Sequence, residues 1–283
     1  MKTNYLESEK NNWSITNCLA KKRLSNLLRS NCFGKHLTHH YIMKQITLLI
    51  SFFFFITASY GQTENSKLKI SHLTGDFYVY TTYKNLNNFL FPSNSMYLVT
   101  NQGVVLFDTP WDTTQFQPLL DSIFAKHQKQ VVMAISTHFH DDRTAGLDFL
   151  NQQGVKTYTS KLTYNLSKQH NEKLAAFYFE NDTTFEVGNH QFETFYAGKG
   201  HTEDNVVIWF ENEKILYGGC LVKSTESSTL GNIADANLND WEQTIRKVMK
   251  KYPKPKLVIP GHFGWKSNKG LKHTIKLVQQ NNL

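Results

Sequence analysis

Short segments in which apolar and polar residues alternate recur through most of the chain, and this period of two is typical of strands with one buried face. Residues 67–73 and 76–83 alternate in this way. Residues 95–100 and 103–108 lie on either side of a turn at residues 101–103 that ends in Gly103. Because glycine is a common turn residue, we expect these two strands to form a hairpin.

Other segments have the period of a helix, with apolar residues recurring every three or four positions. The first of them can begin at a cap provided by Asp112 or Thr113, and the third is predicted to break near Asn171. Pro253 closes the fourth. We expect helices over residues 113–126, 145–153, 161–179, 240–252 and 267–280.

The order of these elements predicts the architecture. Residues 130–136 form a continuous apolar run, which indicates a strand buried on both faces. The order of strands, helix, strand and helices then recurs in the second half. Two packed sheets with helices outside are the simplest way to bury all of these faces. We therefore predict an α/β fold, an αββα sandwich of two mixed β-sheets in a single domain over residues 62–283. The further strands are expected at residues 155–159, 183–187, 191–197, 205–211, 214–218 and 257–259.

The N-terminal part has the pattern of a targeting segment. A charged start at Lys44 precedes an almost wholly apolar run over residues 46–56, and small residues follow it up to Gly61. We expect residues 43–61 to be a cleaved signal peptide that directs the protein to the periplasm. The run is shorter than a membrane span requires, although an uncleaved anchor stays open as the alternative. Residues 1–42 are interpreted as a non-native upstream leader.

Charge is concentrated in the same N-terminal part. The whole chain has 31 Lys and Arg against 23 Asp and Glu, a net charge of +8. Eight of the basic residues but only two of the acidic ones lie within residues 1–61, so the predicted domain is nearly balanced. Nucleic-acid-binding domains carry clustered basic residues, so we expect no nucleic acid as a partner.

Cysteine usage points to a metal. Of three cysteines only Cys220 lies in the predicted domain, which can therefore form no internal disulfide. A lone thiol in an exported protein needs a reason, and metal ligation is one. A buried and inert cysteine is the alternative.

A motif rich in metal-binding side chains follows the strand at residues 130–136. Its sequence is Thr-His-Phe-His-Asp-Asp-Arg over residues 137–143. A spacing of two can direct His138 and His140 to one side of an extended segment. Imidazole and carboxylate are zinc ligands, so Asp142 is a third candidate.

Three further candidates each lie on a glycine-bearing turn beyond a predicted strand. They are His201, Cys220 and His262. Loops held by a rigid scaffold are where sites usually lie. Six candidates suffice for two metal ions, one of which would keep an open position for catalysis. We assign His138, His140 and His201 to the first ion, and Asp142, Cys220 and His262 to the second.

Together these motifs resemble the metallo-β-lactamases, in the subclass with a cysteine ligand and two zinc ions. The motifs are HFHDDR at 138–143, GHTEDN at 200–205, GGC at 218–220 and PGH at 260–262. The resemblance covers residues 67–283. It implies the αββα fold, two Zn²⁺ per chain and antibiotic resistance. It also implies hydrolysis of the β-lactam amide of penicillins, cephalosporins and carbapenems by a metal-bound hydroxide.

The resemblance also assigns roles to residues beyond the metal ligands. Lys223 matches a lysine that holds the substrate carboxylate, and Asn232 matches an asparagine that polarises the lactam carbonyl. Asp142 would also orient the hydroxide, Trp111 would form the pocket floor, and residues 85–91 match a mobile loop over the site. A solvated charge at Lys223, a turn role for Asn232 and core packing of the apolar residues at 85–91 stay open as alternatives.

Two other functions stay open. The first is a related di-zinc hydrolase of a thioester or lactone, in which a histidine follows the second Asp and an Asp bridges the metals. Arg143 and Cys220 occupy those positions here, which favours a β-lactamase. The second is a zinc-storing protein without activity, which the open position of the three-histidine site disfavours. We expect Asp108 and Arg143 to orient ligands, and we expect a monomer.

Overall fold

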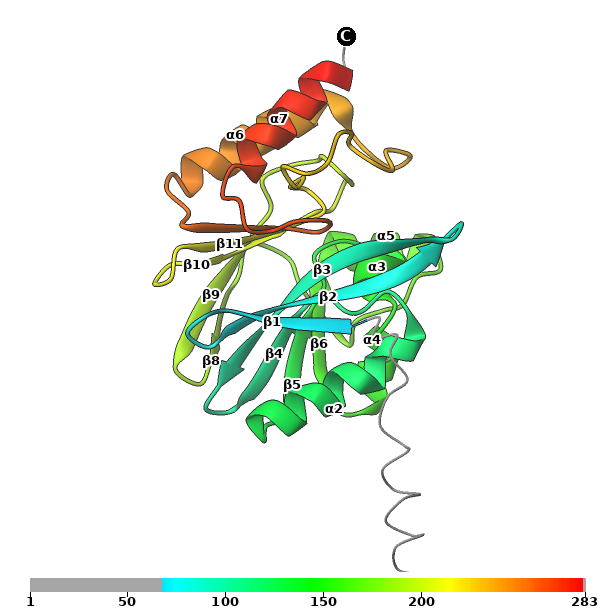
Figure 1. The fold of residues 1–283 in the computed structure, drawn as a ribbon, viewed down its shortest axis with the longest axis vertical. Helices are drawn as coiled ribbons and strands as arrows, with labels where there is room; N and C mark the ends of the chain where they lie inside the picture. The colour runs from blue at the N-terminus through cyan, green and yellow to red at the C-terminus, as the bar shows by residue number, and fades with distance from the viewer. Residues whose placement is uncertain (1–67, 282–283) are drawn as a thin grey trace, which may run out of the picture. The chain divides into compact units, whose positions relative to one another are not determined.

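The computed structural model describes residues 68–281, and those residues lie within one compact unit, Asn65–Leu283 (Figure 1). The predicted leader (1–42) and signal peptide (43–61) fall outside the described residues. Within the described part, no helix combines the length and apolar character that a membrane span would need.

The first sheet has seven strands whose spatial order follows their order in the chain. Neighbours from β1 to β4 are antiparallel, whereas those from β4 to β7 are parallel, so the sheet is mixed. The strands are β1 (Leu68–Thr74), β2 (Phe77–Leu86), β3 (Phe89–Thr100), β4 (Gly103–Phe107), β5 (Val131–Ile135), β6 (Lys156–Ser160) and β7 (Phe177–Phe179).

The second sheet has five strands in the order β12-β11-β10-β9-β8. Only the β11–β12 pair is parallel. The prediction of two mixed sheets is therefore confirmed. The strands are β8 (Thr184–Val187), β9 (His190–Phe195), β10 (Val207–Phe210), β11 (Ile215–Gly219) and β12 (Leu257–Pro260).

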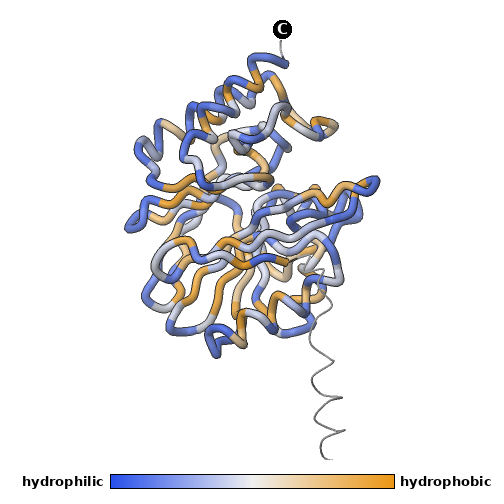
Figure 2. Tube along the Cα trace, viewed as in Figure 1, coloured by the Kyte–Doolittle hydropathy of each residue, from blue (hydrophilic) through white to orange (hydrophobic). Residues whose placement is uncertain are grey.

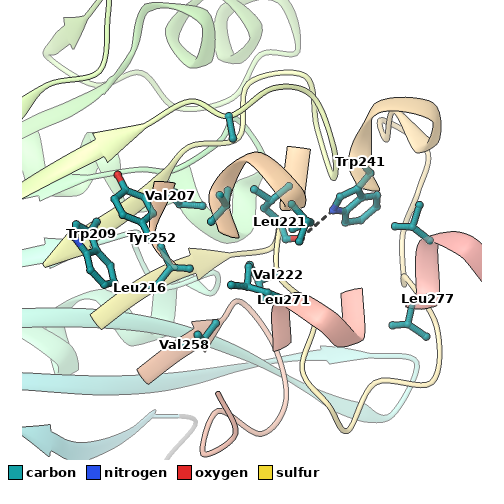
Figure 3. Close-up of a cluster of buried hydrophobic side chains, with 14 of the residues drawn as sticks. Val207, Trp209, Leu216, Leu221, Val222, Trp241, Tyr252, Val258, Leu271 and Leu277 are labelled. Atoms are coloured by element: carbon teal, nitrogen blue, oxygen red, sulfur yellow. Dashed lines mark hydrogen bonds between the residues drawn. The ribbon is translucent and has the colours of Figure 1, made fainter. Parts of the chain in front are cut away.

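Helices cover the outer faces of both sheets, as the sequence predicts (Figure 1). Leu119 and Ile123 of α2 pack on the outer face of the first sheet. Trp241 of α6 and Leu277 of α7 belong to the core over the second sheet, and the Trp241 indole donates to the Leu221 carbonyl at 2.9 Å (Figure 3). The helices are η1 (Thr113–Gln115), α2 (Phe116–His127), α3 (Asp141–Thr144), α4 (Leu147–Gln152), α5 (Lys161–Gln169), α6 (Leu238–Lys251) and α7 (Gly270–Asn281).

The main core lies between the sheets. Buried apolar side chains from both sheets meet there, and apolar stretches of the strands are orange in Figure 2. Phe107 of β4 meets Phe192 and Phe210 of the second sheet edge to face, at ring-centroid distances of 5.1 and 5.2 Å. This packing fixes the two sheets against each other and aligns the strand ends that carry the motifs.

Three local predictions differ from the structure. The expected loop at 85–91 is the end of the β2–β3 hairpin, in which Leu86 pairs with Phe89. Asn87 and Asn88 form its turn with φ of 51° and 67°, a left-handed geometry that asparagine tolerates. Residues 177–179, expected at the end of a helix, form strand β7, because their apolar side chains pack beside β6. Helical structure also begins earlier than residue 145, at Asp141 of α3.

Candidate metal centre

The metal-binding motifs meet because each follows the end of a strand on the same side of the sandwich. His138 follows β5, Cys220 follows β11 directly, and His262 follows β12. Glycine permits the close approach of two of these turns: a Cβ on Gly261 would lie 2.7 Å from the Cys220 Sγ. Gly219 has φ of +50°, a conformation that favours glycine, immediately before Cys220.

Three imidazoles form a near-equilateral group. The ring centroids of His138, His140 and His201 are 4.9, 5.0 and 5.1 Å apart. His138 is fully buried, and neither its Nε2 nor the buried Nδ1 of His201 has a hydrogen-bond partner. Leaving a buried polar atom unpaired costs about 1–3 kcal/mol, so these nitrogens fit a role as metal ligands.

A carboxylate, a thiol and an imidazole form a tighter group beside it. The Cys220 Sγ lies 3.2 Å from the His262 Nε2 and 3.5 Å from the Asp142 Oδ2. The Asp142 Oδ2 is also 3.2 Å from the His262 Nε2. The ligand atoms of these three residues all lie within 4.8 Å of one another, which suits a single ion. His138 also groups with His140 and Asp142 in this way, so the two sets adjoin.

Hydrogen bonds fix which ring nitrogen of two histidines is available. The His262 Nδ1 donates to the Pro92 carbonyl at 2.8 Å, which leaves Nε2 facing Cys220 and Asp142. The His140 Nε2 donates to the Asp235 carboxylate at 2.9 Å, which leaves Nδ1 for a metal. Such outer partners orient a ligand and set its tautomer. Sequence reasoning missed Asp235 because 95 residues separate it from His140.

Most of the candidate ligands have the protonation state that metal binding requires. Burial lowers the pKa of His138, His201 and His262, so these imidazoles are neutral near pH 7. Burial opposes ionisation of Asp142, but Arg143, His262 and His138 together outweigh it and hold the pKa of that carboxyl well below its usual range. Burial raises the pKa of the Cys220 thiol to about 12, against the opposing effect of Arg143.

We therefore expect binding of the metal at Cys220 to release about one proton near pH 7. The thiol is protonated without metal but must ligate as a thiolate. At pH values below the thiol pKa, the affinity of the protein for that ion should therefore rise about tenfold with each unit of pH. Calorimetry in buffers of different ionisation enthalpy counts the protons. The Cys220→Ala variant should lose this release, and an unchanged proton count in it would contradict the ligand assignment.

Arg143 is the charge that holds the second group together. Its side chain is fully buried and lies 2.9 Å from the Asp142 carboxylate, 3.0 Å from the Cys220 Sγ and 3.4 Å from the Asp108 carboxylate. Asp108 in turn accepts from the Thr137 amide at 2.6 Å, at the start of the His138 motif. Burial raises the pKa of Asp108 to about 6, although Arg143 opposes this.

Lys223 is buried rather than solvated. Only 8% of it is exposed, and its Nζ lies 5.1 Å from the Trp241 ring centroid. Burial lowers its pKa to about 8, partly offset by Cys220 and Asp142. The charges of Cys220 and Asp142 act on this buried ammonium group, so Lys223 lies within reach of the second ligand group. The alternative of a solvated charge at Lys223 is wrong.

Of the remaining predicted residues, Trp111 lies beside a candidate ligand and Asn232 contacts none of the six. Trp111 has its ring centroid 6.4 Å from that of His262, and Phe91 of β3 lies 5.1 Å from the same imidazole. Asn232 is exposed, and its Oδ1 accepts from the Ala234 amide at 3.1 Å, as in a turn. No contact among the described residues joins Asn232 to the six candidate ligands.

The hairpin tip is apolar and exposed, so the alternative of core packing is wrong for Leu86, Phe89 and Leu90. Sequence reasoning also missed Lys84 near this tip. Its Nζ lies 2.9 Å from the Asp141 carboxylate and 4.5 Å from the Trp111 ring centroid. The cross-strand pairing of Lys84 with Phe91 could have been found only once the hairpin register was known.

Comparison with known proteins agrees with this geometry. Residues 89–262 match the metallo-beta-lactamase superfamily. A metallo-beta-lactamase type 2 of Elizabethkingia meningoseptica is 41% identical over 222 residues, which span 78% of this chain and 89% of that protein. Metallo-beta-lactamase IND-1 of Chryseobacterium indologenes is 39% identical over 74% of this chain and 87% of its own length. The crystal structure of metallo-beta-lactamase IND-7 is similar with a TM-score of 0.74 and 38% identity, over 77% of this chain and 100% of that chain.

Proposed function

This chain belongs to the metallo-beta-lactamase superfamily and is a metal-dependent β-lactamase, and on that premise we propose how its residues divide the work. His138, His140 and His201 hold one zinc ion. Asp142, Cys220 and His262 hold a second. The observation that carries this proposal is the compact, buried group of a carboxylate, a thiol and an imidazole beside three clustered imidazoles. Bound zinc supplies an activated water near neutral pH and polarises the carbonyl under attack.

The protein residues prepare the attack on the lactam. The Asp142 carboxylate is ionised and buried, so its oxygen can accept a hydrogen bond from the attacking water and orient it. Arg143 keeps that carboxylate in its charged form. Because water is the nucleophile, the chain needs no side chain that becomes acylated.

Lys223 and Asn232 are proposed to position the substrate. Lys223 anchors the carboxylate that penicillins, cephalosporins and carbapenems share, through a charge-assisted hydrogen bond. Asn232 lies on the exposed segment that follows, and it would have to give up its turn contact with Ala234 to reach the lactam carbonyl. Trp111 and Phe91 form an apolar wall beside His262. The exposed hairpin tip covers the apolar parts of the drug.

Replacing Lys223 by methionine should raise the KM for a carbapenem by roughly ten- to a hundredfold, the effect of one lost charge-assisted contact. The kcat should change much less, because the ammonium binds a group that does not react. Steady-state hydrolysis of the free acid and of its carboxylate ester measures this. The ester should be hydrolysed equally by both proteins, and an equal loss on both substrates would show that Lys223 has another role.

A hydrolysis assay also tests the alternative activity on a thioester or lactone. A thioester or lactone hydrolysed faster than every β-lactam by the zinc-loaded protein would favour the related di-zinc hydrolases. Export to the periplasm is also proposed, from the apolar run at residues 46–56. A monomeric state is proposed as the default. A protein recovered from the periplasm without residues 1–61 would support the first.

A further inference from the structure

A hollow lies beside the β2–β3 hairpin, apart from the candidate metal ligands. It measures about 710 Å³ and is lined by β1, by the hairpin and by residues 263–266. Tyr83 and Pro92 pair across the hairpin and line the hollow. The next pair, Lys84 and Phe91, points to the opposite face, toward Trp111 and His262. The volume falls within the range of ligand sites, and no candidate metal ligand lines it.

The chemistry of this hollow is both cationic and aromatic. Lys69 and Lys266 line it, and neither forms an ion pair among the described residues. The acidic residue of the lining, Glu226, already accepts from the Gly264 amide at 2.9 Å. Apolar walls come from the hairpin and from Trp265. Two unpaired ammonium groups beside aromatic walls are complementary to an organic anion with an aromatic body.

Residues that line the hollow are also hydrogen-bonded to the segment that carries His262. Pro92 gives its carbonyl to the His262 Nδ1 at 2.8 Å. Asn94, another lining residue, donates to the Phe263 carbonyl at 2.7 Å and to the Pro260 carbonyl at 3.2 Å. These bonds tie the hairpin to the segment on both sides of His262. A molecule bound between the hairpin and residues 263–266 would therefore change the position of the His262 imidazole.

We propose that this hollow is a second binding site for an amphipathic aromatic anion, and that its occupant modulates β-lactam hydrolysis. The aromatic body lies against Tyr83, Pro92 and Trp265, and a carboxylate or sulfonate lies between Lys69 and Lys266. The occupant acts on kcat through the segment that holds His262. Phe89 and Leu90 of the hairpin tip also line the hollow, so we expect the occupant to change the KM as well.

The test uses the zinc-loaded full chain and 1-anilinonaphthalene-8-sulfonate, a fluorescent aromatic anion, as the probe. We expect one saturable site per chain and a fall in kcat as the probe binds. The double variant Lys69→Gln/Lys266→Gln should weaken probe binding about tenfold, the effect of two partly exposed ionic contacts. The matched control Lys254→Gln/Lys256→Gln removes the same charge from exposed positions outside the hollow and should bind like the wild type.

Three outcomes would overturn the proposal. The first is the absence of saturable binding. The second is an equal weakening in the control variant, which would indicate general attraction to positive charge. The third is probe binding that a β-lactam displaces competitively and that Lys223→Met abolishes, which would place the probe in the catalytic cleft. The fluorescence readout does not depend on hydrolysis, so its result is separable from the proposed division of catalytic work.

Discussion

Replacing Asp142 by asparagine should lower kcat/KM for β-lactams by roughly a thousandfold or more, because the change removes a zinc ligand and the group that orients the water. The carboxylate is 5% exposed and lies between both candidate ligand sets, 3.2 Å from the His262 Nε2 and 3.8 Å from the His138 Nε2. An amide has the same shape but no charge. It would leave the buried Arg143 guanidinium without its closest counter-charge.

The preceding residue provides a matched control. Asp141 is the same amino acid, is partly exposed and pairs with Lys84 at the surface of the site. The Asp141→Asn variant should keep its zinc and stay within a few-fold of wild-type activity, as is usual for an exposed ion pair. Steady-state kinetics and metal analysis of both variants decide the matter. Full activity in Asp142→Asn with two tightly held zinc ions would refute the role given to Asp142.

Replacing Arg143 by methionine should destabilise the metal-free fold by about 3–5 kcal/mol, the usual cost of leaving buried charges unpaired. The guanidinium is fully buried among Asp142, Asp108 and Cys220 and also donates to the Gly261 carbonyl at 3.0 Å. Methionine fills much of the volume but meets none of these groups. Urea unfolding of zinc-free protein isolates this effect from metal binding.

The loss of stability in the Arg143→Met variant should also depend on pH. Burial already raises the folded pKa of Asp108 to about 6, and the loss of Arg143 would raise it further. A carboxyl with a raised folded pKa favours the folded state at low pH, and this contribution is lost as pH rises through the unfolded value toward the folded one. The stability gap between variant and wild type should therefore widen from pH 5 to pH 8. A gap that is constant, or that narrows, would show that Arg143 does not compensate buried carboxylates.

The sequence predicts the sandwich well because its first two strands alternate and residues 131–135 are a continuous apolar run. It predicts the candidate ligands because each one follows a strand and lies beside a glycine or another candidate. The strand ends of two packed sheets then bring residues as distant as His138 and His262 together. Local pattern and topology were sufficient for these features.

Other features depend on contacts that no local pattern encodes. Asp235 meets His140, and Lys84 meets Asp141 and Trp111, only through the folded arrangement of distant segments. The sequence predicts a loop at the tip of the β2–β3 hairpin, whereas the structure has a tight turn in which two asparagines adopt left-handed conformations. The burial of Lys223 also escaped prediction, since its cover comes from Trp241 of a later helix. These contacts depend on strand register and on burial, and neither can be determined from a single sequence.

The most direct test of the whole account is carbapenem hydrolysis by the purified protein, measured together with its zinc content before and after exhaustive chelation. We predict close to two zinc ions per chain, loss of hydrolysis when they are removed and recovery when zinc alone is returned. Hydrolysis that survives thorough removal of metal, or two bound zinc ions without any opening of the β-lactam ring, would contradict it.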